Sequence, residues 1–273
     1  MTTGLRRFAI DVVGIQIDAY TWYRYRRVKR FVSRGPVRTL NVGTGGGFET
    51  LFLLRGGNLV TTLELDAGTA ARTAERVNRN GYSRMHIGIV GHVCAADLGG
   101  PYDQIVMLEV LEHILEDGKA IRSLASCLAP GGKMILSTPT RSHGLLPGDR
   151  ISSVENGDHV RVGYDGPELD LLLQQNGLAT CARKYNGNRL VRRQHITERR
   201  LRRLSRPLGV VFGLACRMFL RLVDISWGGW FDQITVATKD QPRTAAPAGP
   251  AASSQSADSP NLAAGGLSSR HPL

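Results

Sequence analysis

Three side chains that can bind a metal ion or move a proton lie close together in the sequence LEVLEHI. Glu109, Glu112 and His113 follow an apolar run at spacings that place them on one face of a helical turn. Two carboxylates and one imidazole form a partial coordination shell for Mg²⁺ or Mn²⁺, which His159 or else His143 would complete from a later loop. In a second interpretation there is no metal, Glu112 and His113 shape the wall of the site, and His113 or His159 is the general base.

A glycine cluster in TLNVGTGGGFET predicts a ligand-binding turn between a strand and a helix. Gly43, Gly45 and Gly47 let the backbone turn sharply and let its N–H groups approach a ligand. Glu64 ends the next apolar run, where a carboxylate can accept hydrogen bonds from both hydroxyls of a ribose. A dinucleotide is disfavoured, because the G-x-G-x-x-G pattern is missing and the Glu49 carboxylate would repel a pyrophosphate. The predicted ligand is a cationic nucleoside without phosphates.

The elements that must position these residues alternate between strand-like and helical periods. Apolar runs such as TLNV, LVTTLEL, HIGIV, YDQIVML and KMILSTP are separated by helical segments, a pattern typical of a parallel α/β sheet covered on both faces. We expect three regions: an amphipathic helical cap over residues 1–37, an α/β domain over 38–239 and a disordered tail over 240–273, which is poor in large apolar residues. Within the domain, the Gly/Pro/Ser/Asp-rich stretch 140–165 is long enough to be a lid, and 196–226 is predicted to be a helical insertion.

Taken together, several motifs resemble those of the class I S-adenosylmethionine-dependent methyltransferases. The resemblance covers about residues 38–185, and its motifs occur in this order: LNVGTGGGFET, TTLELDAGTAARTA, YDQIVMLEVLEHI, LAPGGKMILSTPT and GDHVRVGYDGPELDLLLQQNGL. It is strongest to the branch that holds quinone-biosynthesis O-methyltransferases and many sugar methyltransferases. It implies a Rossmann-like seven-stranded sheet of order 3-2-1-4-5-7-6, with helices on both faces and the segment FDQITVATK as an antiparallel last strand.

The resemblance also implies a set of residues that bind S-adenosylmethionine. The glycine turn would line its methionine and ribose part, Glu64 would bind the ribose hydroxyls, and Asp97 would lie near the adenine amino group. The full set is Gly43, Thr44, Gly45, Gly47, Glu64, Asp97, Leu98 and Glu109. Asn41 departs from the family, which usually has Asp there, so a non-enzymatic binding or scaffold protein stays an alternative at this stage.

The E-x-x-E-H arrangement resembles that of small-RNA 2′-O-methyltransferases and of quinone O-methyltransferases, whose acceptors offer adjacent oxygens. Attack on a sulfonium methyl group needs an aligned and deprotonated acceptor, and a hydroxyl needs the help of a base or a metal. We therefore expect an O-methyltransferase that acts on a hydroxylated small molecule. A saccharide or glycolipid is preferred, with a quinone or isoprenoid ring, or RNA, as the alternative.

Charge is concentrated in two parts of a chain whose formal net charge is +12. Residues 1–40 hold nine Lys/Arg and two Asp, and residues 182–206 hold ten Lys/Arg and one Glu. No recognisable RNA-binding module precedes the core, so nucleic acid is not the expected partner. The basic and then apolar segment 196–226 is typical of a helix at a membrane surface, although its apolar face could equally pack on the sheet or on a second subunit. Both a monomer and a homodimer are compatible with this pattern.

The chain carries four cysteines without metal-ligand spacing and shows no signal peptide. The longest late apolar run, 208–223, is interrupted by Arg217 and Arg221 and is shorter than a membrane span. We therefore expect a cytoplasmic protein, either free or at the inner face of the membrane.

Overall fold

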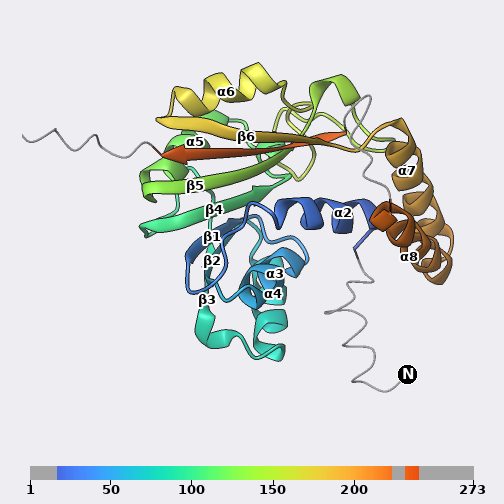
Figure 1. The fold of residues 1–273 in the computed structure, drawn as a ribbon, viewed down its shortest axis with the longest axis horizontal. Coiled ribbons are helices and arrows are strands. Elements are labelled where there is room, and N and C mark those ends of the chain that lie inside the picture. The colour runs from blue at the N-terminus through green and yellow to red at the C-terminus, as the bar shows by residue number, and fades with distance from the viewer. Residues whose placement is uncertain (1–16, 223–230, 240–273) are drawn as a thin grey trace, which may run out of the picture. The chain divides into compact units, whose positions relative to one another are not determined.

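A computed structural model describes residues 17–222 and 231–239 of the chain. Its seven strands form one sheet in the order β3-β2-β1-β4-β5-β7-β6 (Figure 1). The strands are β1 (Arg38–Val42), β2 (Leu59–Glu64), β3 (His86–Val90), β4 (Tyr102–Leu108), β5 (Leu128–Pro139), β6 (Leu178–Asn186) and β7 (Asp232–Lys239). β7 runs antiparallel to both of its neighbours, β5 and β6. The predicted strand order and the antiparallel last strand are confirmed.

Helices cover both faces of this sheet, as the continuous apolar runs of its central strands require. The helices are α2 (Ala19–Val28), α3 (Phe48–Arg55), α4 (Ala67–Arg79), α5 (Asp117–Ser126), α6 (Gly166–Gln174), α7 (Arg189–Leu204) and α8 (Arg206–Leu222). In β4, Ile105 and Met107 join the core beneath α5 and α6, whereas Val106 and Leu108 join the core on the side of α2, α3 and α4. Because successive side chains of a strand point to opposite faces of the sheet, β4 contributes to the core on each face.

Local signals in the sequence fix the ends of several helices. Asp66 caps α4 by accepting a hydrogen bond from the Thr69 N–H at 2.7 Å. Asp165 and Glu168 form a capping box at the start of α6. Gly177 follows α6 with a φ of 73°, the left-handed conformation that suits glycine after a helix.

The predicted cap and insertion meet at one end of the sheet (Figure 1). Helix α2 packs on both α7 and α8, which form a helical hairpin, so that segments far apart in the sequence share a small core of their own. The insertion begins earlier than expected, because α7 already starts at Arg189. Residues 1–16 of the cap, residues 223–226 of the insertion and the predicted tail lie outside the described residues.

The predicted lid, 140–165, has a short 3₁₀ turn, Arg141–His143, and two isolated bridges, Thr140 with Tyr164 and Ile151 with His159. The N–H of Val160 donates to the Glu112 carbonyl at 2.9 Å, so the segment lies directly over the LEVLEHI turn.

The four cysteines are free thiols. Across the described ranges, no helix is both long enough and apolar enough to cross a bilayer.

Candidate functional site

A cavity of about 570 Å³ opens at the carboxyl ends of β1, β2 and β4, where parallel strands of such a sheet bind their ligands. Its walls come from the glycine turn, the ends of these strands, the loop after β3 and the lid. The lining residues are Val42, Gly43, Gly45, Leu63, Glu64, Leu65, Thr69, Gly91, His92, Val93, Glu109, Val110, His113, Ile114, Glu155 and Gly157.

The glycine turn lies between β1 and α3 and has three left-handed residues. Gly43, Gly45 and Gly47 have φ values of 75°, 48° and 72°. The Gly43 N–H donates to the Leu63 carbonyl at 2.8 Å, which ties the turn to β2. A Cβ at Gly43 would overlap the Val110 side chain, whereas a Cβ at Gly45 would meet nothing within 4 Å. Gly45 therefore leaves open the space that a ligand can enter.

This contrast predicts different effects for two similar substitutions. Gly43→Ala forces a left-handed alanine against Val110, and we expect a loss of about 1–3 kcal/mol in the free energy of unfolding. Gly45→Ala strains the backbone by about 1 kcal/mol but adds a methyl group at the cavity wall, so it should weaken ligand binding about tenfold with a smaller loss of stability. Urea unfolding and calorimetric titration with the ligand would test this, and an identical profile for the two variants would contradict it.

Glu64 ends β2 with its carboxylate held in place by the glycine turn. Its Oε2 accepts hydrogen bonds from the Thr44 N–H at 2.8 Å and from the Thr44 hydroxyl at 2.9 Å. Oε1 accepts a 3.2 Å bond from the Asp66 N–H. Because a carboxylate has about four acceptor positions, Oε1 keeps capacity for a hydroxyl in the cavity. Glu64 thus lies at the cavity with a free acceptor position, and its binding of a ribose stays a prediction.

Four of the predicted cofactor residues do not line this cavity: Thr44, Gly47, Asp97 and Leu98. Asp97 is exposed, and its carboxylate accepts a hydrogen bond from the Gly99 N–H at 3.0 Å. Leu98 is buried in the core beneath α5 and α6. The physical reason is that β3 ends at Val90, so the residues that turn into the cavity are those directly after it.

His92 and Glu155 occupy the end of the cavity where Asp97 was expected. The His92 Nε2 lies 2.7 Å from the Glu155 Oε2, and Glu155 also accepts a hydrogen bond from the Leu115 N–H at 2.7 Å. The sequence analysis missed both residues. The sequence could have indicated His92, because it follows the end of the apolar run in GIVGHV. It could not have indicated Glu155, whose contact with His92 depends on the conformation of the lid.

Asn41, the departure from the family pattern, has a structural role. Its amide N–H₂ donates to the Glu49 carboxylate at 2.8 Å, and its carbonyl accepts from the Thr50 hydroxyl at 2.9 Å. Burial raises the pKa of Glu49 well above its ordinary value, although Arg24 and Asn41 oppose this. Asn41 thereby ties β1 to the first turn of α3 and does not line the cavity.

Glu109 was expected on one face with Glu112 and His113, and the structure corrects this. Its φ of 54° is left-handed, and the 3₁₀ turn Leu111–His113 begins only after it. The carboxylate therefore points to other partners: it accepts from the Ser137 hydroxyl at 2.5 Å and lies 3.3 Å from an Arg24 guanidinium nitrogen. Glu109 does not join the group of potential metal ligands among the described residues.

Glu112, His113 and His159 do form such a group, with one ligand atom of each within 4.8 Å of the others. Glu112 Oε2 and His159 Nδ1 are buried and have no hydrogen-bond partner among the described residues. His113 Nδ1 donates a hydrogen bond to the Asp158 carbonyl at 2.9 Å, and its Nε2 lies 3.9 Å from the Glu112 Oε1. The side chain of His143, the other candidate, lies outside the description.

Burial dominates the electrostatics of this group. It raises the pKa of the Glu112 carboxyl well above its ordinary value, and the charge of Glu109 adds to the effect. Burial and the neighbouring His113 both lower the pKa of His159. In the absence of a cation, the group thus favours a protonated Glu112 and a neutral His159, which can accept a proton.

A second cavity, of about 170 Å³, lies beside the first. It is lined by Thr21, Arg24, Glu109, Pro139, Gly144, Leu146, Asp149, His159, Val162, His195 and Phe231. Glu109 borders both cavities, and the rings of His113, at the first cavity, and His159, at the second, are 4.6 Å apart. Arg24 also pairs with Asp232 at 2.8 Å, which holds α2 to β7 at the wall of the second cavity.

Comparison with known proteins gives consistent matches. A family model described as a methyltransferase domain matches residues 18–183. The ubiquinone biosynthesis O-methyltransferase of Caulobacter sp. (strain K31) is 30% identical over 106 residues, which are 39% of this chain and 42% of the relative. The enzyme of the same name from Hydrogenovibrio crunogenus is 27% identical over 186 residues, 64% of this chain and 76% of the relative. The first of these matches therefore spans less than half of its relative.

Solved structures show the same fold at low identity. The S-adenosylmethionine-dependent methyltransferase of Mesorhizobium loti has a TM-score of 0.55 and 15% identity, over 80% of this chain and 98% of that one. A methyltransferase described in the same terms, from Aquifex aeolicus, has a TM-score of 0.51 and 14% identity, over 78% and 88% of the two chains.

Proposed function

Because this chain belongs to the S-adenosylmethionine-dependent class I methyltransferases and is thus an enzyme, we propose that its acceptor is a hydroxyl oxygen on a small quinone-type ring. The sequence analysis preferred a saccharide or glycolipid and kept the ring as its alternative. The named relatives favour that alternative, since they are ubiquinone biosynthesis O-methyltransferases. No comparison names a saccharide acceptor among the relatives described above.

The observation that carries the proposal is the junction between the two cavities. A methyl donor held by Glu64 and the glycine turn occupies the larger cavity, and the smaller one receives the acceptor. Glu109 and the pair His113 and His159 lie where the two meet. The acceptor side offers Leu146, Val162 and Phe231 to the apolar part of a ring, and its remaining side chains, among them Thr21 and His195, are mostly polar or charged.

The residues of the chain account for alignment and for proton removal. When bound, S-adenosylmethionine would supply an electrophilic methyl group on its sulfonium, and Glu64 would hold its ribose. Glu109, held by Arg24 and Ser137, forms the shared wall. The acceptor hydroxyl must lose its proton, and the neutral His159 Nδ1 or His113 Nε2 can take it.

We include a divalent cation in the proposal, because the donor set fits one. Glu112, His113 and His159 each present an atom within the same small volume, and two of these atoms are buried without a partner. A cation there would favour the ionised form of the buried Glu112 and would lower the pKa of a bound hydroxyl. Burying two such polar atoms without any ligand would cost free energy.

Transfer of labelled methyl groups tests the acceptor class directly. The purified chain is incubated with labelled S-adenosylmethionine and an extract of its source cells, which is then separated into lipid, saccharide and RNA pools, with Mg²⁺ or with EDTA. We expect label in the lipid pool. Added catechol, a ring with adjacent hydroxyls, should compete as an acceptor and reduce the amount of label in that pool. Label confined to the saccharide pool would contradict the quinone-type acceptor and favour a saccharide. Label in RNA would contradict a small-molecule acceptor altogether.

A further inference from the structure

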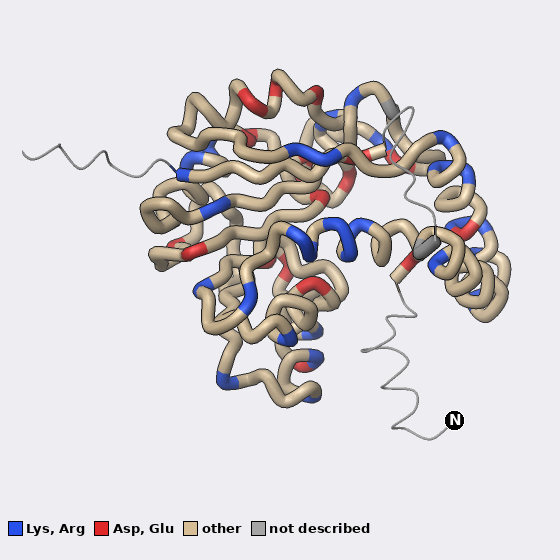
Figure 2. Tube along the Cα trace, viewed as in Figure 1, with Lys and Arg blue, Asp and Glu red and all other residues tan. Residues whose placement is uncertain are grey.

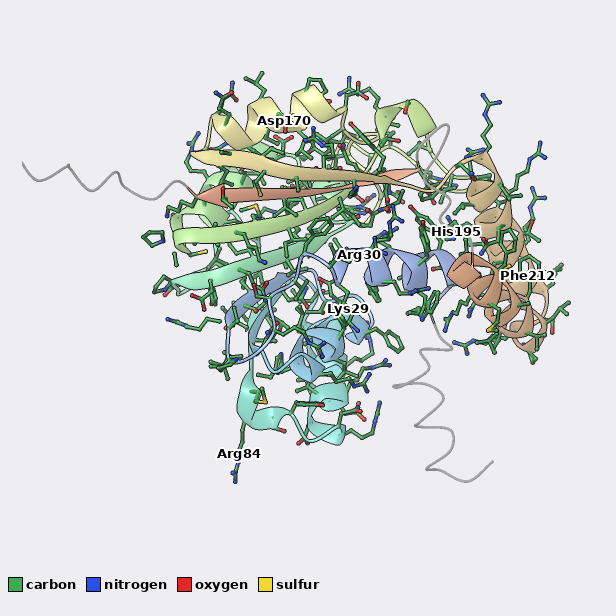
Figure 3. The ribbon with its side chains drawn as sticks, viewed as in Figure 1. Lys29, Arg30, Arg84, Asp170, His195 and Phe212 are labelled. Atoms are coloured by element: carbon green, nitrogen blue, oxygen red, sulfur yellow. The ribbon has the colours of Figure 1, made fainter. Side chains whose placement is uncertain are left out.

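Helix α7 turns one imidazole into the acceptor cavity. Its sequence is mostly basic, and Figure 2 shows these positions along the hairpin that α7 forms with α8. The buried residues of α7 are Val191, His195 and Glu198, which share one helical face. His195 lies on the side of α7 next to α2 (Figure 3) and lines the smaller cavity. Removal of the acceptor proton by another histidine leaves this imidazole without a role.

Asp18 determines how the ring of His195 is presented. The buried Nδ1 of His195 lies 3.2 Å from Oδ1 of Asp18, the residue that precedes α2. Burial tends to raise the pKa of the Asp18 carboxyl, but His195 and Thr21 together bring this pKa well below its ordinary value, so Asp18 is ionised. A carboxylate at this distance favours the tautomer with the proton on Nδ1. Nε2 is then the ring nitrogen that remains for a ligand in the cavity.

A purely structural role does not account for this pair. Asp18 caps α2 through Thr21, whose N–H and hydroxyl donate to it at 2.9 and 2.7 Å, so the cap needs no imidazole. The His195 ring packs edge-on against Tyr20 and Phe231, with its centroid 5.8 Å from each of theirs, and a phenyl ring could fill the same place. Burial of an imidazole costs free energy unless its polar atoms find partners.

His195 and His159 mark different parts of the acceptor cavity. His159 contacts the ring of His113, with centroids 4.6 Å apart, where the two cavities meet. His195 instead contacts Tyr20 and Phe231, whose own centroids are 4.4 Å apart. The acceptor hydroxyl that reacts must lie at the junction. A polar group at His195 therefore belongs to another part of the acceptor.

The place of His195 in the chain also indicates acceptor selection. The match to the methyltransferase family model ends at residue 183, and α7 begins only at Arg189. Helix α7 is thus an addition to the matched domain. The same fold supports different functions through the sites that are added to it, so an inward-facing polar residue of such an addition fits a role in selecting the acceptor.

We propose that His195 is a specificity-determining residue that binds a second hydroxyl of the acceptor ring, on the side away from the methylated oxygen. This inference rests on the proposed function, because it takes the smaller cavity as the acceptor site. A hydroxyl suits the position, since it can donate to the neutral Nε2 and can also accept from the protonated ring, whereas a carbonyl can only accept. Asp18 is the positioning residue, and Thr21 holds its carboxylate in place.

Methyl transfer to two catechols that differ at one position tests this proposal. Hydroxyhydroquinone carries a third hydroxyl where 4-methylcatechol carries a methyl group, and both are assayed with the full chain and S-adenosylmethionine in the absence of oxygen. We expect the wild type to prefer hydroxyhydroquinone about tenfold in kcat/KM, as for one hydrogen bond. His195→Phe should reduce this ratio to about one. His195→Gln keeps a side chain that forms hydrogen bonds and should retain part of the preference.

Two further variants separate recognition from folding. Asp18→Asn should give an intermediate ratio, because asparagine still caps the helix but carries no charge to hold the imidazole tautomer. Thr197→Ala is the control on α7 and should leave the ratio unchanged, since Thr197 is exposed and its hydroxyl donates to the Arg193 carbonyl at 2.8 Å. Each variant is first titrated with S-adenosylhomocysteine. Its affinity should stay close to the wild-type value, because His195 does not line the larger cavity.

The outcomes distinguish this inference from the proposed function. An equal ratio in the wild type and in His195→Phe would overturn the inference, and His195→Gln decides in the same way if the phenylalanine variant does not bind S-adenosylhomocysteine. A wild type that methylates both rings without preference would also overturn it, while the proposed function would stand. A wild type that binds S-adenosylhomocysteine but methylates neither ring would overturn the proposed acceptor class and this inference with it.

Discussion

Replacing Glu64 by alanine is expected to raise the dissociation constant for S-adenosylmethionine about 100-fold. Hydrogen bonds to a charged group contribute about 1.5–3 kcal/mol each, and the loss of those to the ribose converts to a change of this size. The Thr44 N–H and hydroxyl also lose their acceptor, which removes two of the hydrogen bonds that hold the glycine turn to β2. Calorimetric titration with S-adenosylhomocysteine and with the methyl donor would measure the effect on binding without turnover.

The matched control is Glu75→Ala. The Glu75 side chain is 74% exposed on α4 and pairs with Arg79 at the surface, so its removal changes the charge of the chain equally. Affinity in this control should stay within a factor of two or so of the wild type, as for an exposed ion pair. If Glu64→Ala bound the cofactor as tightly as Glu75→Ala, the ribose would have to be held elsewhere in the cavity.

The sheet was predictable because its signals are local and redundant. Each central strand is a short apolar run bounded by turn residues, and the helices between them start at caps such as Asp66 and end near glycines such as Gly177. The strand order came from the family resemblance, and the structure has the same order. Periodicity alone would have given the alternation of strands and helices without their order in space.

The orientation of α8 illustrates what periodicity leaves undetermined. Its sequence is apolar almost all round, so the periodicity does not say which side is buried. The side that carries Gly213 and Leu220 faces inward, because Gly213 lies against the fully buried Glu198 of α7. A contact between helices is a tertiary property, so the helix was predictable and its orientation was not.

The site was predicted best where backbone geometry follows directly from the residue type. The glycine turn and Glu64 lie at the cavity as expected, because both are fixed by the ends of adjacent parallel strands. The assumption of a helical turn failed for Glu109, whose left-handed backbone points the carboxylate to Arg24. The prediction that Asp97 lines the cofactor cavity is wrong, because the residues directly after β3, among them His92, line it instead.

Removing the Glu112 carboxylate by a Glu112→Gln substitution is expected to lower kcat/KM for methyl transfer by about 10²–10³-fold. Affinity for the methyl donor should stay close to the wild-type value, because Glu112 does not line the larger cavity. His113→Ala should have a comparable effect on transfer, since it removes the imidazole that lies between Glu112 and His159. Glu116→Gln is the control, because Glu116 is exposed and pairs only loosely with Lys119 at 3.3 Å.

Removal of metal ions by EDTA distinguishes two roles of Glu112, His113 and His159, as ligands of a cation or as general bases without a metal. If a cation is held there, EDTA should reduce the wild-type enzyme to the level of Glu112→Gln, and added Mg²⁺ or Mn²⁺ should restore the wild type but not the variant. If EDTA leaves the wild-type rate unchanged while His113→Ala still loses activity, an imidazole alone removes the acceptor proton. Full activity in both Glu112→Gln and His113→Ala would exclude these two residues from catalysis, because the loss of a metal ligand or of a general base slows the reaction.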